Sequence, residues 1–282
     1  MVKQNKLLIF IILGFSCLSI SCNVDLLGLF ASSQLDDRLG SKDNFVFLAD
    51  ANYPDQLTPS FGSGDYSFIV ITDTHIEDGK VWGLEKLIDV IQSNSNIKFV
   101  VFLGDITQNG SSADIDRFIG IANDIRDLGV HCYPVIGNHD IYFGNWKVWD
   151  EKIGSTSYRI DADRATLFIL DSANSYFGKK QLDWLENEIK VTRAHTFVFT
   201  HSSLFVPGFA AFQRITDTRE RSRMMSILRN KCDIMFMGHS HKRAFNEAGN
   251  VRYITIEDFK GTSVYCLVTV TSSGIIYKFE KL

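Results

Sequence analysis

The first half of the chain alternates short apolar runs with stretches of helical spacing. Residues 66–71 form an apolar run with β-branched residues, which predicts a buried strand. Residues 80–92 then carry apolar side chains at helical spacing. A second strand is predicted at 99–103, a helix at 113–126 and a third strand at 132–136. This β-α-β-α-β order favours a mostly parallel sheet with helices packed on it.

The second half is mixed. The C-terminal stretch 251–279 alternates strand-like runs with turn residues and is expected to be antiparallel. The remaining strands are predicted at 157–160, 166–170, 196–200 and 234–237, and the helices at 181–189 and 218–230. The pattern therefore predicts a mixed α/β fold rather than one purely parallel sheet.

The N-terminus has the features of an export signal. Lys3 and Lys6 precede an apolar run from Leu7 to Leu18, which is too short for a transmembrane span. A small residue stands directly before Cys22, which resembles the lipobox of bacterial lipoproteins, although Leu18 lies four rather than three residues before the cysteine. The resemblance implies that residues 1–21 are removed and that lipidated Cys22 anchors an exported protein to a membrane of the cell envelope. An ordinary cleaved signal peptide with an incidental cysteine is the alternative.

Length and composition favour one domain after that signal. The 282 residues are 45% hydrophobic, enough for one substantial core. Residues 22–64 show no sustained period and are expected to form a lipidated N-terminus, a tether and a loosely docked segment before a single domain at 65–282. The net charge of -4 argues against specific nucleic-acid binding. Cys132, Cys232 and Cys266 lie in apolar stretches and are expected to be buried rather than paired.

Polar motifs follow five of the predicted strands. They are Asp73-Thr74-His75, Gly104-Asp105, Gly137-Asn138-His139-Asp140, His201 and Gly238-His239-Ser240-His241. In open α/β sheets ligands bind beyond the carboxyl ends of the strands, so all five could converge on one rim. Each motif alone is a common turn or a structural histidine. Their occurrence in order, each after an apolar strand, indicates one shared site; His131 and His195 lie outside it and receive no role.

The side chains in these motifs suit divalent metal ions. Carboxylate, imidazole and amide ligands together favour hard or borderline cations. The i, i+2 spacing of Asp73 with His75, and of His239 with His241, places both side chains on one side of an extended segment. Asp105 stands alone after its strand and could bridge two metals, which about 3.5–4 Å apart can clamp the attacking and leaving oxygens of a phosphoryl displacement.

The five motifs together resemble the signature of the calcineurin-like metallophosphoesterases, over roughly residues 66 to 260. The resemblance implies a four-layer α/β/β/α sandwich of two mixed sheets. It implies one metal held by Asp73, His75, Asp105 and His241, and a second held by Asp105, Asn138, His201 and His239. A hydroxide shared by the two metals would be the nucleophile.

His139 is not a ligand in this scheme. The resemblance implies that it hydrogen-bonds the phosphate and protonates the leaving oxygen, a role suited to an imidazole that titrates near neutrality. Asp140 could orient His139 or could be a turn cap, and the sequence leaves both open.

Within this family, the chain most resembles the phosphodiesterases. Gln108 stands where purple acid phosphatases have a tyrosine ligand, and Asp140 stands where serine/threonine phosphatases have glutamate. The strings at 158–161, 168–172 and 181–185 resemble small bacterial phosphodiesterases of the class III cyclic nucleotide type, and they also have a plain structural interpretation as strand, strand and helix. A phosphomonoesterase, a pyrophosphohydrolase of the same fold, or a non-catalytic surface-binding lipoprotein are the alternatives.

Substrate and metal stay open at this point. A nucleotide, a lipid head group or an envelope glycan phosphate would each suit an exported enzyme. Manganese and iron are the expected metals, with zinc, cobalt or nickel as alternatives, because availability decides among them. The apolar stretch 204–212 is interpreted either as a substrate lid or as a packed loop.

Overall fold

The computed structural model describes residues 35–41, 43–205 and 214–282. The predicted signal peptide, Cys22, the start of the tether and most of the 204–212 stretch lie outside these residues. Within them, no helix combines the length and the apolar character needed to cross a bilayer.

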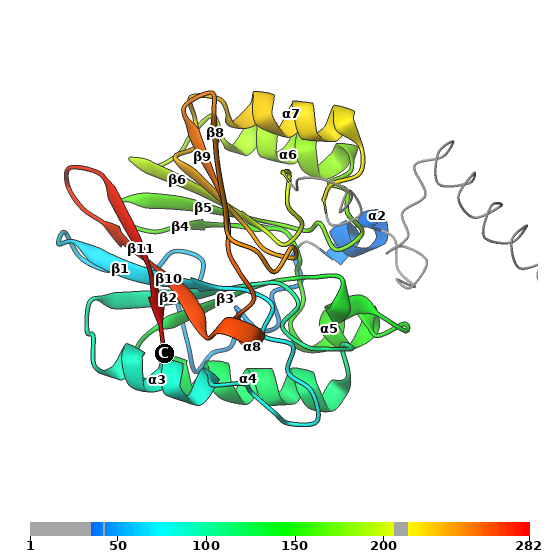
Figure 1. The fold of residues 1–282 in the computed structure, drawn as a ribbon, viewed down its shortest axis with the longest axis vertical. Helices are drawn as coiled ribbons and strands as arrows, with labels where there is room; N and C mark the ends of the chain where they lie inside the picture. The colour runs from blue at the N-terminus through cyan, green and yellow to red at the C-terminus, as the bar shows by residue number, and fades with distance from the viewer. Residues whose placement is uncertain (1–34, 42, 206–213) are drawn as a thin grey trace, which may run out of the picture.

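Two β-sheets pack face to face, with helices on both outer faces (Figure 1). The first sheet has the order β11-β10-β1-β2-β3. Its strands are β1 (Tyr66–Ile71), β2 (Ile97–Leu103), β3 (His131–Val135), β10 (Val264–Val270) and β11 (Ile275–Lys281). The second sheet has the order β4-β5-β6-β7-β9-β8. Its strands are β4 (Tyr158–Asp161), β5 (Ala165–Leu170), β6 (His195–Thr200), β7 (Ile234–Met237), β8 (Ala244–Ala248) and β9 (Val251–Thr255).

The helices complete a four-layer α/β/β/α sandwich, as the family resemblance implies (Figure 1). α3 (Leu84–Gln92) and α4 (Ser112–Arg126) cover the first sheet, and α6 (Lys179–Glu188) and α7 (Thr218–Leu228) cover the second. The short elements are α2 (Leu35–Arg38), η1 (Leu39–Ser41), η2 (His139–Ile141), α5 (Trp146–Lys152) and α8 (Phe259–Thr262). α4 begins where the Ser111 hydroxyl accepts a hydrogen bond from the backbone N–H of Asp114.

The direction of the strands determines where the five polar motifs lie. β1, β2 and β3 are mutually parallel, and so are β5, β6, β7 and β9. The antiparallel C-terminal prediction is confirmed for β10 with β11 and for β9 with β8, whereas β9 lies parallel to β7 on its other side. The carboxyl ends of the parallel strands in both sheets meet at the side where α8 and the loop into α5 lie (Figure 1).

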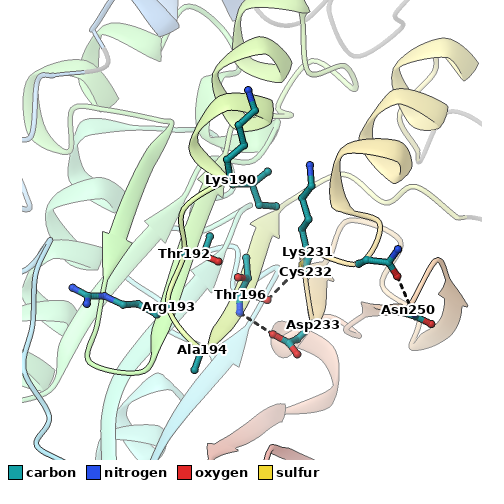
Figure 2. Close-up of a pocket in the computed structure, with 11 residues that line it drawn as sticks. Lys190, Thr192, Arg193, Ala194, Thr196, Lys231, Cys232, Asp233 and Asn250 are labelled. Atoms are coloured by element: carbon teal, nitrogen blue, oxygen red, sulfur yellow. Dashed lines mark hydrogen bonds between the residues drawn. The ribbon is translucent and has the colours of Figure 1, made fainter.

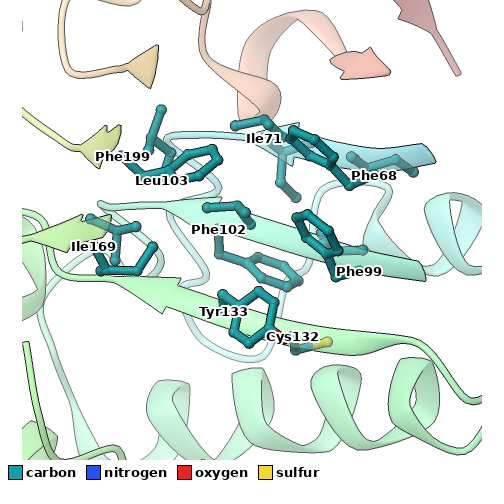
Figure 3. Close-up of a cluster of buried hydrophobic side chains, with 14 of the residues drawn as sticks. Phe68, Ile71, Phe99, Phe102, Leu103, Cys132, Tyr133, Ile169 and Phe199 are labelled. Carbon is teal, nitrogen blue, oxygen red and sulfur yellow. The ribbon is translucent and has the colours of Figure 1, made fainter. Parts of the chain in front are cut away.

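Aromatic side chains fill the space between the sheets (Figure 3). The ring of Phe68 in β1 stacks on Phe99 in β2 with centroids 4.4 Å apart, and meets the edge of Phe197 from the second sheet at 5.2 Å. Phe102 faces the other way and contacts Phe118 of α4. Cys132, Cys232 and Cys266 are buried and unpaired, as expected for apolar positions, and burial raises the pKa of the Cys132 thiol to about 12.

The segment from Leu35 is firmly packed, which corrects the prediction of a loosely docked segment. Leu35 and Arg38 are fully buried, and Phe47 belongs to the main core. The Arg38 guanidinium forms two hydrogen bonds with the Asp171 carboxylate, at 2.7 and 2.9 Å. The partner of this arginine lies 133 residues away, so no local pattern could have revealed it.

We expect Arg38→Ala to destabilise the fold by about 3–5 kcal/mol, because it leaves the buried Asp171 carboxylate without its cation. Urea unfolding followed by circular dichroism would measure the change. The double variant Arg38→Met with Asp171→Leu is the control, since it removes both charges and should lose much less stability. A loss of under 1 kcal/mol in the single variant would show that the segment is dispensable.

Candidate metal centre

The eight predicted metal-site and acid residues come together at the carboxyl ends of five strands. Five of them follow β1, β2 and β3 of the first sheet, and three follow β6 and β7 of the second. In chain order they are Asp73, His75, Asp105, Asn138, His139, His201, His239 and His241. The convergence predicted from strand direction is therefore observed, and both sheets contribute.

Asp105 lies at the centre of the site and is 1% exposed. Its Oδ2 lies 3.1 Å from Nε2 of His201, 3.9 Å from Nε2 of His75 and 4.0 Å from Nε2 of His139. Its Oδ1 accepts a hydrogen bond from the backbone N–H of His139. The carboxylate thus reaches histidines from both sheets, as a bridging ligand must.

Asp73 supplies a second carboxylate to the site. Its Oδ1 lies 3.1 Å from Nε2 of His241 and 3.7 Å from Nε2 of His75. Its Oδ2 accepts hydrogen bonds from the Thr72 hydroxyl and the backbone N–H of His239. One oxygen is therefore fixed by the protein, and the other faces the histidines.

The ligand atoms fall into groups whose members lie within 4.8 Å of one another. One group is Asp73, His75 and His241, and another is Asp105, His201 and His239. They correspond to the two halves of the ligand set that the family resemblance implies, apart from Asn138 and the shared Asp105. A third group, His75, Asp105 and His139, lies where the two halves meet. The arrangement suits two adjacent cations.

Buried polar atoms without a hydrogen-bond partner show whether these side chains are suited to bind two metal ions. Buried polar atoms without a hydrogen bond ordinarily destabilise a protein by about 1–3 kcal/mol each. Among the described residues, such atoms include Asp73 Oδ1, both ring nitrogens of His75, Asn138 Oδ1, His201 Nε2 and His239 Nε2. They belong to five of the seven predicted ligands, and a cation coordinated at each of these side chains would satisfy one such atom of it. The donor set therefore fits.

The charges of the site favour cation binding. Burial opposes ionisation of Asp105, but the neighbouring His201 and His139 imidazoles hold its pKa below the ordinary value. Burial likewise disfavours a charged His201, yet the Asp105 carboxylate raises the pKa of His201 to about 9. Burial lowers the pKa of His239 to about 4, so this imidazole is neutral and offers a lone pair. A cation bound at His201 displaces its proton, which couples binding to pH.

Much of the site backbone is strained. Five of the predicted ligands adopt positive φ angles, between 44° and 67°, although none is glycine. They are Asp73, His75, Asp105, His239 and His241. Such conformations cost about 1–3 kcal/mol each and gather at functional sites, where surrounding contacts hold them.

Gly104 lies directly against the ring of a predicted ligand. Its φ is +85°, and a Cβ there would lie 2.5 Å from the His201 ring. We expect Gly104→Ala to lower the free energy of unfolding by at least about 1–2 kcal/mol and to displace His201. Urea unfolding and manganese stoichiometry would measure the two effects. Gly120→Ala in α4 is the matched control, since its Cβ meets no atom within 4 Å and should stabilise the helix by about 0.5–1 kcal/mol.

Asp140 does not orient His139, which corrects one of the two sequence interpretations. Its carboxylate accepts hydrogen bonds from the backbone of Gly137 and Thr107 and from the Thr107 hydroxyl. Asp140 is therefore a turn cap, which is the other of the two interpretations. His139 Nδ1 instead lies 2.8 Å from the carbonyl oxygen of Gln108.

Sequence reasoning also missed two neighbours of the ligands. The Tyr142 hydroxyl accepts a hydrogen bond of 2.6 Å from the Asn138 amide, which directs the Asn138 carbonyl oxygen into the site. The Leu103 carbonyl lies 2.9 Å from His201 Nδ1. Such partners fix ligand orientation. Backbone carbonyls carry no sequence signal, and Tyr142 is a single aromatic four residues after Asn138.

A separate hollow of about 620 Å³ lies at the opposite, amino ends of β6 and β7 (Figure 2). Lys190, Arg193 and Lys231 line it, but Arg193 extends in a different direction from the two lysines (Figure 2). Asp233 is hydrogen-bonded to the backbone N–H of Thr196. This hollow therefore does not have the convergent groups of the metal centre.

Comparison with known proteins agrees with the geometry. Residues 66–243 match the sequence profile of the calcineurin-like phosphoesterases. The chain belongs to this family. Calcineurin-like phosphoesterases are a metal-dependent family with a dinuclear centre.

Individual relatives of this calcineurin-like phosphoesterase are more distant. A curated protein of Fibrobacter succinogenes named a probable cyclic nucleotide phosphodiesterase is 30% identical over 157 residues, which are 53% of this chain and 60% of that protein. The match thus spans less than two thirds of the relative's length.

Two solved structures show the same fold at low identity. A dimetal phosphatase from Danio rerio has a TM-score of 0.59 at 14% identity, covering 76% of this chain and 95% of its own. A purple acid phosphatase from yellow lupin seeds has a TM-score of 0.62 at 12% identity, covering 78% of this chain and 52% of its own.

Proposed function

We propose that this phosphoesterase hydrolyses phosphodiesters, with His139 as the general acid. The observation that best supports this proposal is the orientation of the His139 side chain. The Gln108 carbonyl holds Nδ1, so Nε2 faces the site 4.0 Å from Asp105 Oδ2, and the side chain remains 25% exposed. A partly exposed imidazole at the edge of the ligand cluster can reach a leaving oxygen.

The other site residues hold the metals. We propose Asp73, His75, Asp105 and His241 around one cation, and Asp105, Asn138, His201 and His239 around the other. When bound, the two cations neutralise the phosphate and acidify a shared water molecule. The protein supplies their spacing, through Asp105, and the orientation of each ligand, through Thr72, Leu103 and Tyr142. Manganese or iron is the proposed metal, with zinc, cobalt or nickel as the alternatives.

The diester preference is supported by the curated relative, whose name includes cyclic nucleotide phosphodiesterase. We expect the manganese-restored protein to hydrolyse bis(4-nitrophenyl) phosphate with a higher kcat/KM than 4-nitrophenyl phosphate. Treatment with chelator should abolish both reactions, and added Mn²⁺ should restore them. A higher kcat/KM on the monoester would overturn the diesterase proposal while leaving the metal-dependent hydrolase intact.

We also propose that the protein is exported and anchored to the bacterial cell envelope through lipidated Cys22. Lys3, Lys6, the apolar run and the small residue before Cys22 support this. Substrates at that location would be nucleotides, lipid head groups or glycan phosphates. Cells expressing the chain should incorporate labelled fatty acid into it, and Cys22→Ala should not be labelled. Equal labelling of the variant would contradict the anchor.

A further inference from the structure

A strained turn next to the metal centre holds a phenylalanine in solvent. Tyr142–Asn145 form a tight turn in which the backbone N–H of Asn145 donates to the Tyr142 carbonyl. Both central residues have positive φ, 56° at Phe143 and 88° at Gly144. This is the type I′ pattern, whose first central position strongly favours asparagine, aspartate or glycine. A bulky side chain there is an outlier that calls for a reason.

Other turns of the chain show the usual choice. Asp78 and Gly79 occupy the two positive-φ positions of the turn closed from Lys80 to Glu77, and Gly249 and Asn250 join β8 to β9. Small or short polar residues thus appear where only the turn matters. Phe143 departs from this rule.

Trp82 also departs from this rule, but its side-chain contacts compensate for the strained backbone. Trp82 and Gly83 have φ angles of 47° and 99° in the turn closed from Leu84 to Val81. The Trp82 indole N–H donates to the His75 carbonyl, and the ammonium of Lys260 lies 4.8 Å from the ring centroid. Trp82 therefore stabilises the segment that carries a predicted ligand.

Phe143 has no comparable anchor among the described residues. It is 71% exposed, and the ring contact the structure gives it is the edge of Tyr142 at 5.9 Å. Burial therefore does not offset the strain. Local rules broken without structural compensation are expected at functional sites.

The position of Phe143 in the site relates this side chain to the leaving group of the substrate. The Tyr142 ring lies 4.6 Å from the ring of His139, so the three aromatic rings form a continuous series from the proposed acid to solvent. A general acid must lie within hydrogen-bond reach of the leaving oxygen. The residues packed beside His139 therefore face the leaving group rather than the part of the substrate that stays on phosphorus.

We propose that Phe143, with Tyr142, forms a subsite that stacks against a planar ring on the leaving group of the diester. The inference rests on the proposed function, since His139 identifies the leaving side. In the reaction, water supplies the new oxygen on phosphorus and the bond from phosphorus to the ring-bearing oxygen breaks. His139 protonates that oxygen, and the proton lost by water balances the one that His139 gives.

The experiment measures binding, so it does not require turnover. Benzyl(methyl)phosphinate and (cyclohexylmethyl)(methyl)phosphinate differ in whether the ring is planar and carry it on a P–C bond that is not hydrolysed, and calorimetry on the manganese-loaded protein gives both Kd values. We expect the benzyl compound to bind about 2- to 12-fold more tightly, the range for one aromatic pair. Phe143→Leu should bring the ratio close to one. Phe245→Leu is the matched control, because Phe245 is also exposed but packs on Tyr277 and Phe279.

A second variant tests the strain. Phe143→Asn should raise Tm by about 2–4 °C, since asparagine suits this turn, and should also abolish the phenyl preference. A fall in Tm would show that Phe143 is structural and would overturn the proposal, as would a phenyl preference that persists in Phe143→Leu. Phenyl preference without diester turnover would instead overturn the proposed function alone.

Discussion

Replacing Asp105 with asparagine is expected to remove metal binding and activity together. The Asp105 carboxylate lies between histidines of both sheets, and an amide has neither its charge nor two equivalent oxygens. Loss of an outer hydrogen-bond partner alone weakens metal sites by 10- to 100-fold, so loss of this ligand should exceed about 100-fold. Manganese titration and bis(4-nitrophenyl) phosphate hydrolysis would report the two losses.

The control is Asp116→Asn, which makes the same chemical change at an exposed carboxylate paired with Lys152. Surface pairs contribute little, so its metal affinity and rate should stay within about twofold of the unmodified protein. If Asp105→Asn retained two manganese ions per chain with unchanged affinity, Asp105 would not be the bridging ligand.

His139→Ala is expected to keep both metals and to lose about 10²- to 10⁴-fold in kcat, the contribution typical of general acid catalysis. The loss should be largest for diesters with poor leaving groups, because those need protonation most. Rates for a series of aryl diesters, together with manganese stoichiometry, would establish this.

His195→Ala is the matched histidine change, since His195 lies at the amino end of β6, away from the site, and should leave the rate unchanged. Metal release from His139→Ala would make His139 a ligand instead. An equal loss across all leaving groups would contradict its role as the acid.

The fold was largely predictable because apolar runs and helical spacing mark buried elements directly. The three parallel strands of the first half and both helix layers follow from those patterns. α5 and β8 were missed: α5 has only seven residues, and β8 is an edge strand with half-buried residues such as Ala244 and Asn246. The parallel pairing of β9 depends on contacts with β7 that the sequence of β9 does not encode locally.

The site was predictable to the extent that its residues follow strands. The position of Asp105, Asn138 and His201 at strand ends is enough to bring them to one rim. What holds them in place was not predictable, because the partners are backbone carbonyls at Leu103 and Gln108. The role of Asp140 was undecided because a carboxylate beside a histidine can bond either to the ring or to nearby backbone, and only the fold selects the backbone.

The division of the site between two sheets has a thermodynamic consequence. Cations bound as proposed, by Asp105 from one sheet and His201 from the other, would join the two halves of the sandwich. Binding at 100 times the Kd stabilises a folded chain by about 2.7 kcal/mol, provided the unfolded chain does not bind. We therefore expect the free concentration of divalent cation to govern how long each molecule survives unfolding and proteolysis, in addition to how fast it turns over.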